Sequence, residues 1–359
     1  MRKRYILLAL GCVGITVAAL MMAMRREHQD LYRMTILPSL GGKVTTLTGL
    51  NNQGQAVGYS EAADGSCHLC LWDREGRVQD LGPAIRSLFR LNDAGQIAGT
   101  TLDAHGNEVA FLWDGARGTR MLGTLGGAES VALGLNNGGQ VVGWSRTAAG
   151  LKHAFVWDET TGMRDLGTPE GDGSEARAIN DNGQIVGVSD QEPGRPAWWA
   201  LTGPASVGRQ LRGFFGFSDI NTQGCTAGRL SFRDGRDFMV LWWPDGAPKK
   251  LFPVDQEIQR WPAISDANQI LFAERHRRWL EPIRRKILSP ESEYYVWDPN
   301  RGRIGLNRHV PTKRGERVEF FDLNDRGCLA GHLLGPGLSY VSGVLLEPIP
   351  ERWRKPRAR

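Results

Sequence analysis

Short apolar segments separated by glycine, asparagine and aspartate turns follow one another along almost the whole chain after residue 30. In the clearest stretch one segment ends at Asn136, and the next three cover residues 140–144, 153–158 and 163–167. Each segment is only a few residues long, rich in β-branched or aromatic side chains and bounded by turn formers, which is typical of strands. A helical repeat would need long glycine-free stretches of 3.6-residue period, and the sequence has none. The pattern predicts an all-β protein built from units of four short strands.

The four-strand unit recurs along the chain. The first strand of each unit ends at an anchor residue, and the anchors are Asn51, Asn92, Asn136, Asn180, Asn221, Ser265 and Asn324. Successive anchors lie 41 or 44 residues apart, except that 59 residues separate the last two. Four strands in 40 to 45 residues is typical of a propeller blade. We therefore predict a seven-bladed β-propeller, and we call the seven units the first to the seventh copy.

The two ends of the repeat region predict how the propeller closes. The seventh copy has three strand-like segments and no fourth before the basic tail, whereas residues 32–37 supply an extra strand before the first full copy. Pairing this N-terminal strand into the last blade would remove exposed sheet edges, which otherwise invite aggregation. The chain then divides into a membrane anchor or signal segment at 1–30, the propeller at 31–348 and a basic tail at 349–359.

Residues 5–24 form an uncharged and mostly apolar run, about as long as a helix that crosses a bilayer. This run is long for a cleaved signal, and Met21-Met22-Ala23 is a poor cleavage site. We therefore expect an uncleaved transmembrane helix, with a cleaved signal or a lipid anchor at Cys12 as the alternatives. Three cations in residues 1–4 favour a cytoplasmic N-terminus. The propeller would then be extracytoplasmic, in the periplasm or at the cell surface, and secreted if the segment is cleaved.

Composition and charge narrow the classes of function. The 46 glycines fit a fold with many tight turns. The net charge of +5 is unevenly distributed, because basic residues gather at residues 1–26, 275–286 and 352–359 while the repeats between them are acidic overall. This distribution argues against a nucleic-acid-binding face over the whole fold.

The third copy contains His153-Ala154-Phe155 within a frame that reads Leu-Gly-Thr-Leu-Gly-Gly, then Gly-Gln-Val-Val-Gly, then Asp-Leu-Gly. This frame resembles the HAF-repeat family of predicted extracellular repeat proteins. The resemblance covers residues 34–346 and is strongest in the first four copies. It implies export and a repeat architecture, and it brings no activity with it. The segments at 109–111, 196–198 and 238–240 keep an apolar strand without the histidine, which indicates that the tripeptide packs rather than forms a shared site.

The sixth copy carries a basic insertion between two of its strands. The cations and the aromatic residue of this insertion are Arg275, Arg277, Arg278, Trp279, Arg284, Arg285 and Lys286. Insertions in repeat folds map to loops on one face, which is often the binding face. We interpret these residues as a candidate ligand site for an anionic glycan, an anionic lipid or an acidic protein. A solvated loop that balances the acidic propeller is the alternative.

Three recurrent residue types have both a functional and a structural interpretation. The anchor asparagines suit turns, with a polar ring lining the channel as the alternative. Tryptophan ends the third strand in five copies, at Trp72, Trp113, Trp157, Trp242 and Trp297. We expect these tryptophans to pack between blades rather than form an aromatic cage. Cys67 and Cys70 resemble half of a zinc site, but no second cysteine pair follows at metal spacing.

No nucleophile elbow, His-Glu-x-x-His sequence or phosphate-binding glycine loop occurs in the chain. The sequence therefore favours a non-catalytic binding or scaffolding propeller, without metal or cofactor, tethered to the membrane outside the cytoplasm. The alternative is an exported propeller enzyme, a hydrolase or lyase acting on glycans, with acids gathered at the mouth of the channel.

Overall fold

The computed structural model describes residues 30–85, 87–168, 171–189, 195–200, 206–207, 214–231, 236–243, 248–254, 258–275 and 292–353. The strands of the first three copies, with β1 before them, are β1 (Tyr32–Ile36), β2 (Gly41–Leu50), β3 (Ala56–Ala62), β4 (Cys67–Trp72), β5 (Val78–Pro83), β6 (Arg90–Leu91), β7 (Ile97–Leu102), β8 (Glu108–Asp114), β9 (Gly118–Met121), β10 (Gly126–Leu135), β11 (Val141–Thr147), β12 (Lys152–Asp158) and β13 (Gly162–Gly167).

The remaining elements are β14 (Ser174–Ile179), β15 (Gln184–Ser189), β16 (Arg195–Ala200), β17 (Ser206–Val207), β18 (Phe214–Ile220), β19 (Thr226–Ser231), β20 (Asp237–Trp242), β21 (Pro248–Val254), β22 (Ile258–Ile264), β23 (Ile270–Arg275), β24 (Ser292–Asp298), β25 (Gly302–Gly305), η1 (Leu306–Arg308), β26 (Arg317–Leu323), β27 (Leu329–Leu334), η2 (Pro336–Leu338), β28 (Val341–Pro348) and α2 (Pro350–Trp353).

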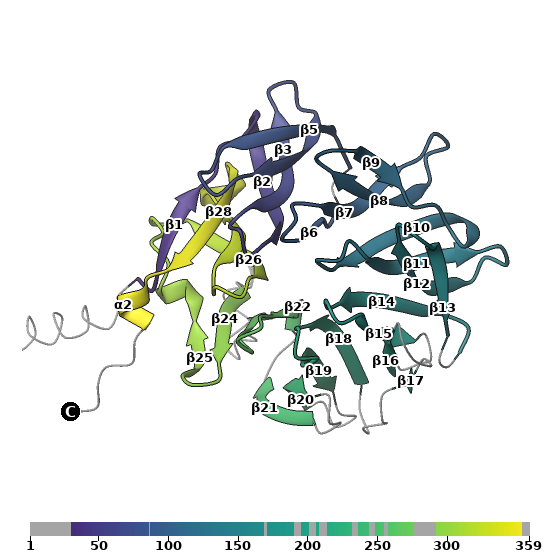
Figure 1. The fold of residues 1–359 in the computed structure, drawn as a ribbon. Coiled ribbons are helices and arrows are strands. Elements are labelled where there is room, and N and C mark those ends of the chain that lie inside the picture. Colours follow the sequence, from purple (N-terminus) through teal and green to yellow (C-terminus); the bar gives the residue numbers. More distant parts are fainter. Residues whose placement is uncertain are drawn as a thin grey trace, which may run out of the picture.

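The strands form small antiparallel sheets around a common centre (Figure 1). Five sheets have four strands in chain order, and they run from β6–β9 to β22–β25. The sixth sheet has eight strands and joins β26–β28 to β2–β5. Among the described residues, the strands of its two halves share one paired position, the parallel pair of Val44 and Val341. In each of the five four-stranded sheets the strand that comes first in the chain lies nearest the centre (Figure 1).

The N-terminal strand closes the last sheet, as the sequence predicted. Strand β1 pairs antiparallel with β28, in a register that runs from Tyr32 opposite Pro348 to Ile36 opposite Val344. Helix α2 follows β28 directly, and its Trp353 donates from Nε1 to the Leu31 carbonyl at 3.1 Å. Trp353 also packs edge-on against the Tyr32 ring. The described fold therefore continues to residue 353, a few residues into the predicted tail.

A glycine in the second strand lets the inner strand bulge toward it. In the third copy a Cβ at Gly143 would lie 1.8 Å from the Val131 carbonyl oxygen, a distance that no side chain tolerates. The register of β10 on β11 shifts next to this contact, between Ala132 and Gly134. In the sixth copy Phe272 takes the place of this glycine, and the shift there is wider because the register skips from Arg260 to Ala263. Gly-Gln-Val-Val-Gly is thus a bulge signature.

The core lies between adjacent sheets, where the strand-ending tryptophans pack as expected. Trp157 is buried against Ala98 and Ala110 of the preceding sheet. Trp72 is fully buried in a cluster with Cys328 and Ala330 of the seventh copy, and its Nε1 donates to the Pro38 carbonyl at 2.9 Å. These contacts confirm inter-sheet packing for the tryptophans at these positions.

The predicted membrane helix at residues 5–24 lies outside the described residues. Within residues 30–353, over the parts that the structure describes, no helix has the length and apolar character needed to cross a bilayer.

Candidate functional site in the central channel

The anchor asparagines form a ring of hydrogen bonds around the centre, which we call the asparagine ring. Each asparagine donates from Nδ2 to the backbone carbonyl of the next anchor at 2.9–3.2 Å, and the bond from Asn324 to Asn51 joins the last anchor to the first. Each Oδ1 also accepts the backbone N–H four residues on, for example that of Gln140 at 2.9 Å from Asn136. The predicted turn role is therefore confirmed, and the same side chains also join the sheets. Ser265 is the anchor that lacks the amide donor.

The residues that follow the anchors form a second ring at the mouth of the channel. Four of the seven are acidic, and the set is Asn52, Asp93, Asn137, Asp181, Thr222, Asp266 and Asp325. Six of the seven donate their backbone N–H to the side chain of the next member, as from Asn52 to Asp93 at 2.7 Å and from Asn137 to Asp181 at 2.8 Å. A cavity of about 200 Å³ opens here, lined by all seven copies. The enzyme alternative requires acids at the mouth of the channel, and these four lie there. Each of them accepts a backbone N–H of the preceding member and so joins adjacent turns.

Four charged side chains converge deeper in the channel, in a second cavity of about 140 Å³. They are Arg90, Arg177, Asp219 and Asp322, from the second, fourth, fifth and seventh copies. We call this space the channel cavity. It shares lining residues with the mouth cavity, so the two follow each other along the channel.

Both channel aspartates bind backbone N–H groups of the inner strands. Asp219 Oδ2 accepts from Ile264 at 3.0 Å, and Asp322 Oδ2 accepts from Leu50 at 2.8 Å. The other oxygen of each carboxyl accepts the N–H of its own following residue, at 2.9 and 3.0 Å. Each aspartate thus connects its inner strand to that of the next copy.

The channel changes the acidity of both aspartates. Burial raises the pKa of Asp219 to about 7, and the nearby charge of Asp322 adds to the effect. Burial also raises the pKa of Asp322, while the positive charge of Arg90 opposes that rise. The Asp219 carboxyl therefore titrates near neutral pH. In chemical terms the cavity offers a proton donor and acceptor beside two guanidinium groups.

Our sequence analysis missed the four channel residues, although the repeat carries a signal for three of them. The residue two before each anchor is Gly or Ala in four copies, and it is Arg90, Asp219 or Asp322 in the other three. The position two before the anchor directly follows the bulge of the inner strand. Its residues line the channel cavity. Charged residues at an otherwise small position were the available indication.

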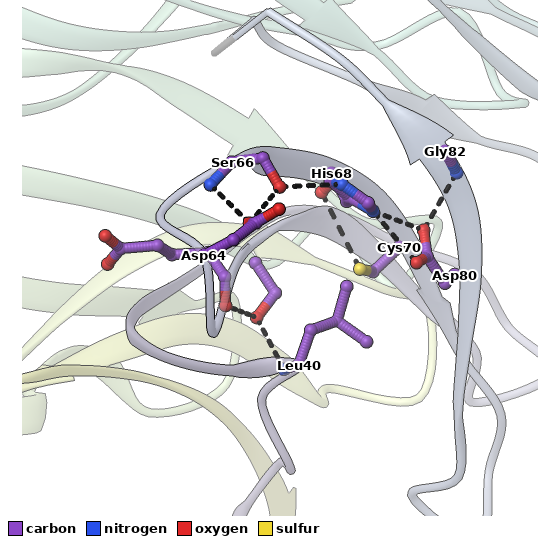
Figure 2. A network of polar contacts seen from close by, with 9 residues as sticks. Leu40, Asp64, Ser66, His68, Cys70, Asp80 and Gly82 are labelled. Atoms are coloured by element: carbon purple, nitrogen blue, oxygen red, sulfur yellow. Dashed lines mark hydrogen bonds and ion pairs between the residues drawn. The ribbon is translucent and has the colours of Figure 1, made fainter.

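A separate polar network lies on the outer strands of the first copy (Figure 2). His68 on β4 contacts Asp80 on β5 through Nδ1 at 2.8 Å, and its Nε2 lies 3.0 Å from the Ser66 hydroxyl. In the third copy His153 pairs with Asp165 at the same 2.8 Å. The histidine of the repeat therefore bonds the aspartate of the Asp-Leu-Gly segment in these two copies. It joins two strands by a polar contact, where the sequence suggested packing alone.

Ser66, His68 and Asp80 have the order of contacts found in serine hydrolases, but two features weigh against a nucleophile. The Ser66 hydroxyl lies 2.5 Å from Asp64 Oδ1, in a turn where Asp64 also accepts the Ser66 N–H at 2.9 Å. That carboxylate accepts the hydroxyl proton, so the oxygen does not face an incoming carbonyl. Neither cavity of the channel includes these residues. We interpret the network as a structural connection between β4 and β5 and the turn before them.

The basic insertion lies almost wholly outside the described residues. Arg277, Arg278, Trp279, Arg284, Arg285 and Lys286 fall in the gap at residues 276–291. Arg275 is described only as the last residue of β23. The connection leaves the sixth copy between β23 and β24, the position that the β3–β4 turn with Ser66 occupies in the first copy. The prediction for these residues stays a prediction.

Within the described parts of the chain, no group of three or more histidine, cysteine, aspartate or glutamate side chains is placed to hold a metal ion. Cys70 is buried, whereas Cys67 is partly exposed. Burial raises the pKa of the Cys70 thiol to about 12.

Comparisons with known proteins place this geometry among β-propellers. No family model and no curated protein matches the sequence. The β-propeller domain of the trilobed protease from Pyrococcus furiosus has a TM-score of 0.56 at 10% identity, covering 85% of this chain and 96% of that one. A catalytically inactive virginiamycin B lyase from Staphylococcus aureus with quinupristin has a TM-score of 0.51 at 11% identity, covering 89% and 100%. TolB from Acinetobacter baumannii has a TM-score of 0.46 at 14% identity, covering 75% of this chain and 64% of TolB.

These likenesses show the fold alone, because all the identities are low. The chain is an all-β protein with a β-propeller fold. The neighbours include a lyase and a domain of a protease, so the fold does not select a function.

Proposed function

We propose that the chain is a seven-bladed propeller that acts as a non-catalytic binding or scaffolding module, tethered to the membrane by residues 5–24 and exposed outside the cytoplasm. One observation carries the non-catalytic part. The acids that converge in the channel, Asp219 and Asp322, each use both oxygens to accept backbone N–H groups. Carboxylates that accept two backbone N–H groups connect adjacent inner strands. A catalytic acid or base must instead be free to reach a substrate.

Seven blades are supported by the sheets and by the rings. Five four-stranded sheets and the two halves of the eight-stranded sheet give one unit for each copy of the repeat. The asparagine ring passes through all seven anchors, including the carbonyl of Ser265. The HAF-repeat resemblance implies a repeat architecture and export.

The partner side of the proposal rests on the basic insertion. Its six cations and Trp279 fit an anionic glycan, an anionic lipid or an acidic protein. The acidic repeats make nucleic acid a poor partner. Location decides among these partners, because only an extracytoplasmic propeller meets cell-surface glycans.

Protease access to the C-terminal tail in intact spheroplasts tests the location. We expect cleavage within residues 354–359 without detergent, together with retention of the N-terminal segment on the same polypeptide. Protection of the tail until detergent is added would place the propeller in the cytoplasm and overturn this part of the proposal. A periplasmic and a cytoplasmic marker protein, probed in the same samples, control for leakage.

A second candidate function is the exported enzyme acting on glycans. The observation in its favour is that Asp219, whose pKa burial raises to about 7, lies in one cavity with Asp322 and Arg90. Loss of glycan-cleaving activity in both Asp219→Asn and Asp322→Asn variants that still fold would establish it. Absence of cleavage by the wild-type protein over a panel of cell-wall and capsular glycans would support the non-catalytic proposal.

A further inference from the structure

The inner strands present backbone N–H groups to the channel. In the second, third and fourth copies the anchor N–H bonds the glutamine carbonyl of the neighbouring strand, at 3.1, 3.1 and 3.0 Å. Bonding directions alternate along an antiparallel strand, so the N–H of the preceding residue points to the opposite edge, toward the centre. These residues are Leu91, Leu135 and Ile179.

The same position in two other copies shows that such N–H groups take an anionic acceptor. The N–H of Leu50 bonds Asp322, and that of Ile264 bonds Asp219. No side-chain acceptor occurs among the described residues for the N–H groups of Leu91, Leu135 and Ile179. Ile179 is buried, and Leu91 and Leu135 are partly buried. Backbone N–H groups in such places normally have a partner, so an acceptor, either water or an anion, is expected on this side of the channel.

Two guanidinium groups border the same side of the channel cavity. Arg90 donates from Nε to the Leu133 carbonyl at 2.9 Å, which directs the guanidinium across the third copy. Among the described residues no carboxylate lies within ion-pair distance of Arg90, so its two terminal amino groups lack an anionic partner. Arg177 is held by Glu175 at 2.9 Å, and Glu175 also binds Lys152.

On one wall of the cavity, from the second to fourth copies, Arg90 and the N–H groups of Leu135 and Ile179 are donors without an anionic acceptor among the described residues. Arg177 lines the same wall and is paired with Glu175. On the other wall, Asp219 and Asp322 already accept backbone N–H groups with both oxygens. The cavity of about 140 Å³ has room for one small oxyanion group.

We propose that the channel cavity binds a small oxyanion, a sulfate, phosphate or carboxylate group, with Arg90 as its ion-pair partner and the N–H groups of Leu135 and Ile179 as hydrogen-bond donors. This inference names the kind of ligand that the proposed binding module takes. It rests on the proposed function only in assuming that the propeller is a binding module. An oxyanion suits the site because a guanidinium offers paired donors to oxygen atoms and backbone N–H groups add to them. A cation is disfavoured by Arg90.

The opposite wall couples binding to protons. Asp219 is faced by Asp322 from β26, by Arg90 from β6 and by the Ile264 N–H from β22. A bound anion repels the ionised carboxyl and stabilises its neutral form, so binding takes up protons. Because burial raises the pKa of Asp219 to about 7, affinity should increase as the pH falls through neutrality.

Calorimetric titration of the full-length chain in dodecyl maltoside with sodium sulfate tests the proposal. Sulfate keeps its charge over the range in which Asp219 titrates, about pH 5 to 8. We expect saturable binding by the wild-type protein. Arg90→Gln, which can still donate to Leu133, should weaken binding at least tenfold, or ~1.4 kcal/mol. Arg164→Gln, on the outer strand β13, is the matched control and should bind as the wild type does.

Each outcome of the titration has a fixed meaning. Absence of saturable sulfate binding by the wild-type protein, or equal binding by Arg90→Gln, would overturn the proposal. Equal weakening by Arg90→Gln and Arg164→Gln would also overturn it, because the effect would then be general electrostatics. If Arg90→Gln does not fold, Arg90→Lys keeps the charge without the paired donors and should bind more weakly than the wild type. Titration with acetate and with phosphate separates a preference for carboxylates from one for tetrahedral anions.

Asp219→Asn gives an independent readout. It should bind sulfate more tightly than the wild type at neutral pH and lose the pH dependence; unchanged pH dependence would exclude the proton coupling. These results are separate from the proposed function. A cytoplasmic location or a glycan-cleaving activity would leave the sulfate titration unaltered, and failure to bind sulfate would leave the location untouched.

Discussion

The gap in the asparagine ring predicts a stabilising substitution, Ser265→Asn. Six anchors donate from Nδ2 to the next anchor carbonyl, whereas the serine hydroxyl only accepts the Gln269 N–H at 3.2 Å. The acceptor for a seventh bond is present, because the Asn324 carbonyl binds Gly327 N–H and keeps a second lone pair. Gln269 stands where the first four copies have the glutamine that accepts the anchor amide, as Gln140 does at 2.8 Å.

The magnitude follows from the bonds gained. An asparagine at 265 adds two hydrogen bonds, to Asn324 and to Gln269, each contributing about 0.5–1.5 kcal/mol net. Ordering the longer side chain costs about 1 kcal/mol. The free energy of unfolding should therefore rise by about 1 kcal/mol. The reverse change, Asn136→Ser, removes the same two bonds and should lower it by a similar amount.

Urea denaturation of the full chain in detergent, followed by tryptophan fluorescence, measures both changes as shifts of the midpoint at constant slope. Ser265→Asp is the matched control, because aspartate has the size of asparagine and accepts the Gln269 N–H but cannot donate to Asn324. It should be less stable than the wild type. If Ser265→Asn does not raise the midpoint while Asn136→Ser lowers it, the anchor bonds are not equivalent around the ring. If neither variant changes the midpoint, the ring does not stabilise the fold and our argument is wrong.

Three further predictions concern the bulge, the channel and the buried thiol. Gly143→Ala should destabilise by about 3 kcal/mol or more, because its Cβ would meet the Val131 carbonyl oxygen, whereas Gly115→Ala should change the urea midpoint little. Because the pKa of Asp219 is raised to about 7 in the fold, the folded state binds a proton that the unfolded state releases. Stability should thus fall as the pH rises from about 4 to 7, and Asp219→Asn should flatten this fall in urea midpoints measured across that range. Native Cys70 should react with iodoacetamide about a thousandfold more slowly than Cys70 of the urea-unfolded chain, because burial raises its pKa to about 12. Peptide mapping measures both rates. Comparable rates would mean that the thiol is exposed.

The architecture could be predicted from the sequence because each level of it repeats. Turn residues recur at fixed spacing, the anchors give the period, and the extra strand at residues 32–36 matches the missing strand of the last copy. The bulge glycine was also visible, as the second glycine of the Gly-Gln-Val-Val-Gly segment, although its reason was not. That reason is the approach of the Val131 carbonyl, a contact between strands that no local pattern expresses.

The channel site was harder to predict, because its members come from copies far apart in the chain. Asp219 and Asp322 are separated by about a hundred residues, and Arg90 lies further away still. Only closure of the ring brings them into one cavity. A search for motifs looks for residues that are close in sequence, so it favoured the basic insertion and passed over single charges at a position that is small elsewhere.

The deviations from the repeat therefore separate into two kinds. Some are compensated by the fold, as when Phe272 replaces the glycine and the register of β22 shifts more widely to make room. Others are not compensated by a direct ion pair among the described residues, and Arg90 is the clearest case. Its charge lowers the pKa values of Asp219 and Asp322, but no carboxylate lies at ion-pair distance from it. A repeat protein keeps its inner positions small so that the inner strands can approach one another. A long cation placed there costs desolvation, and a bound anion would offset that cost. This asymmetry makes Arg90, more than any residue of the repeated frame, the position from which to look for a ligand.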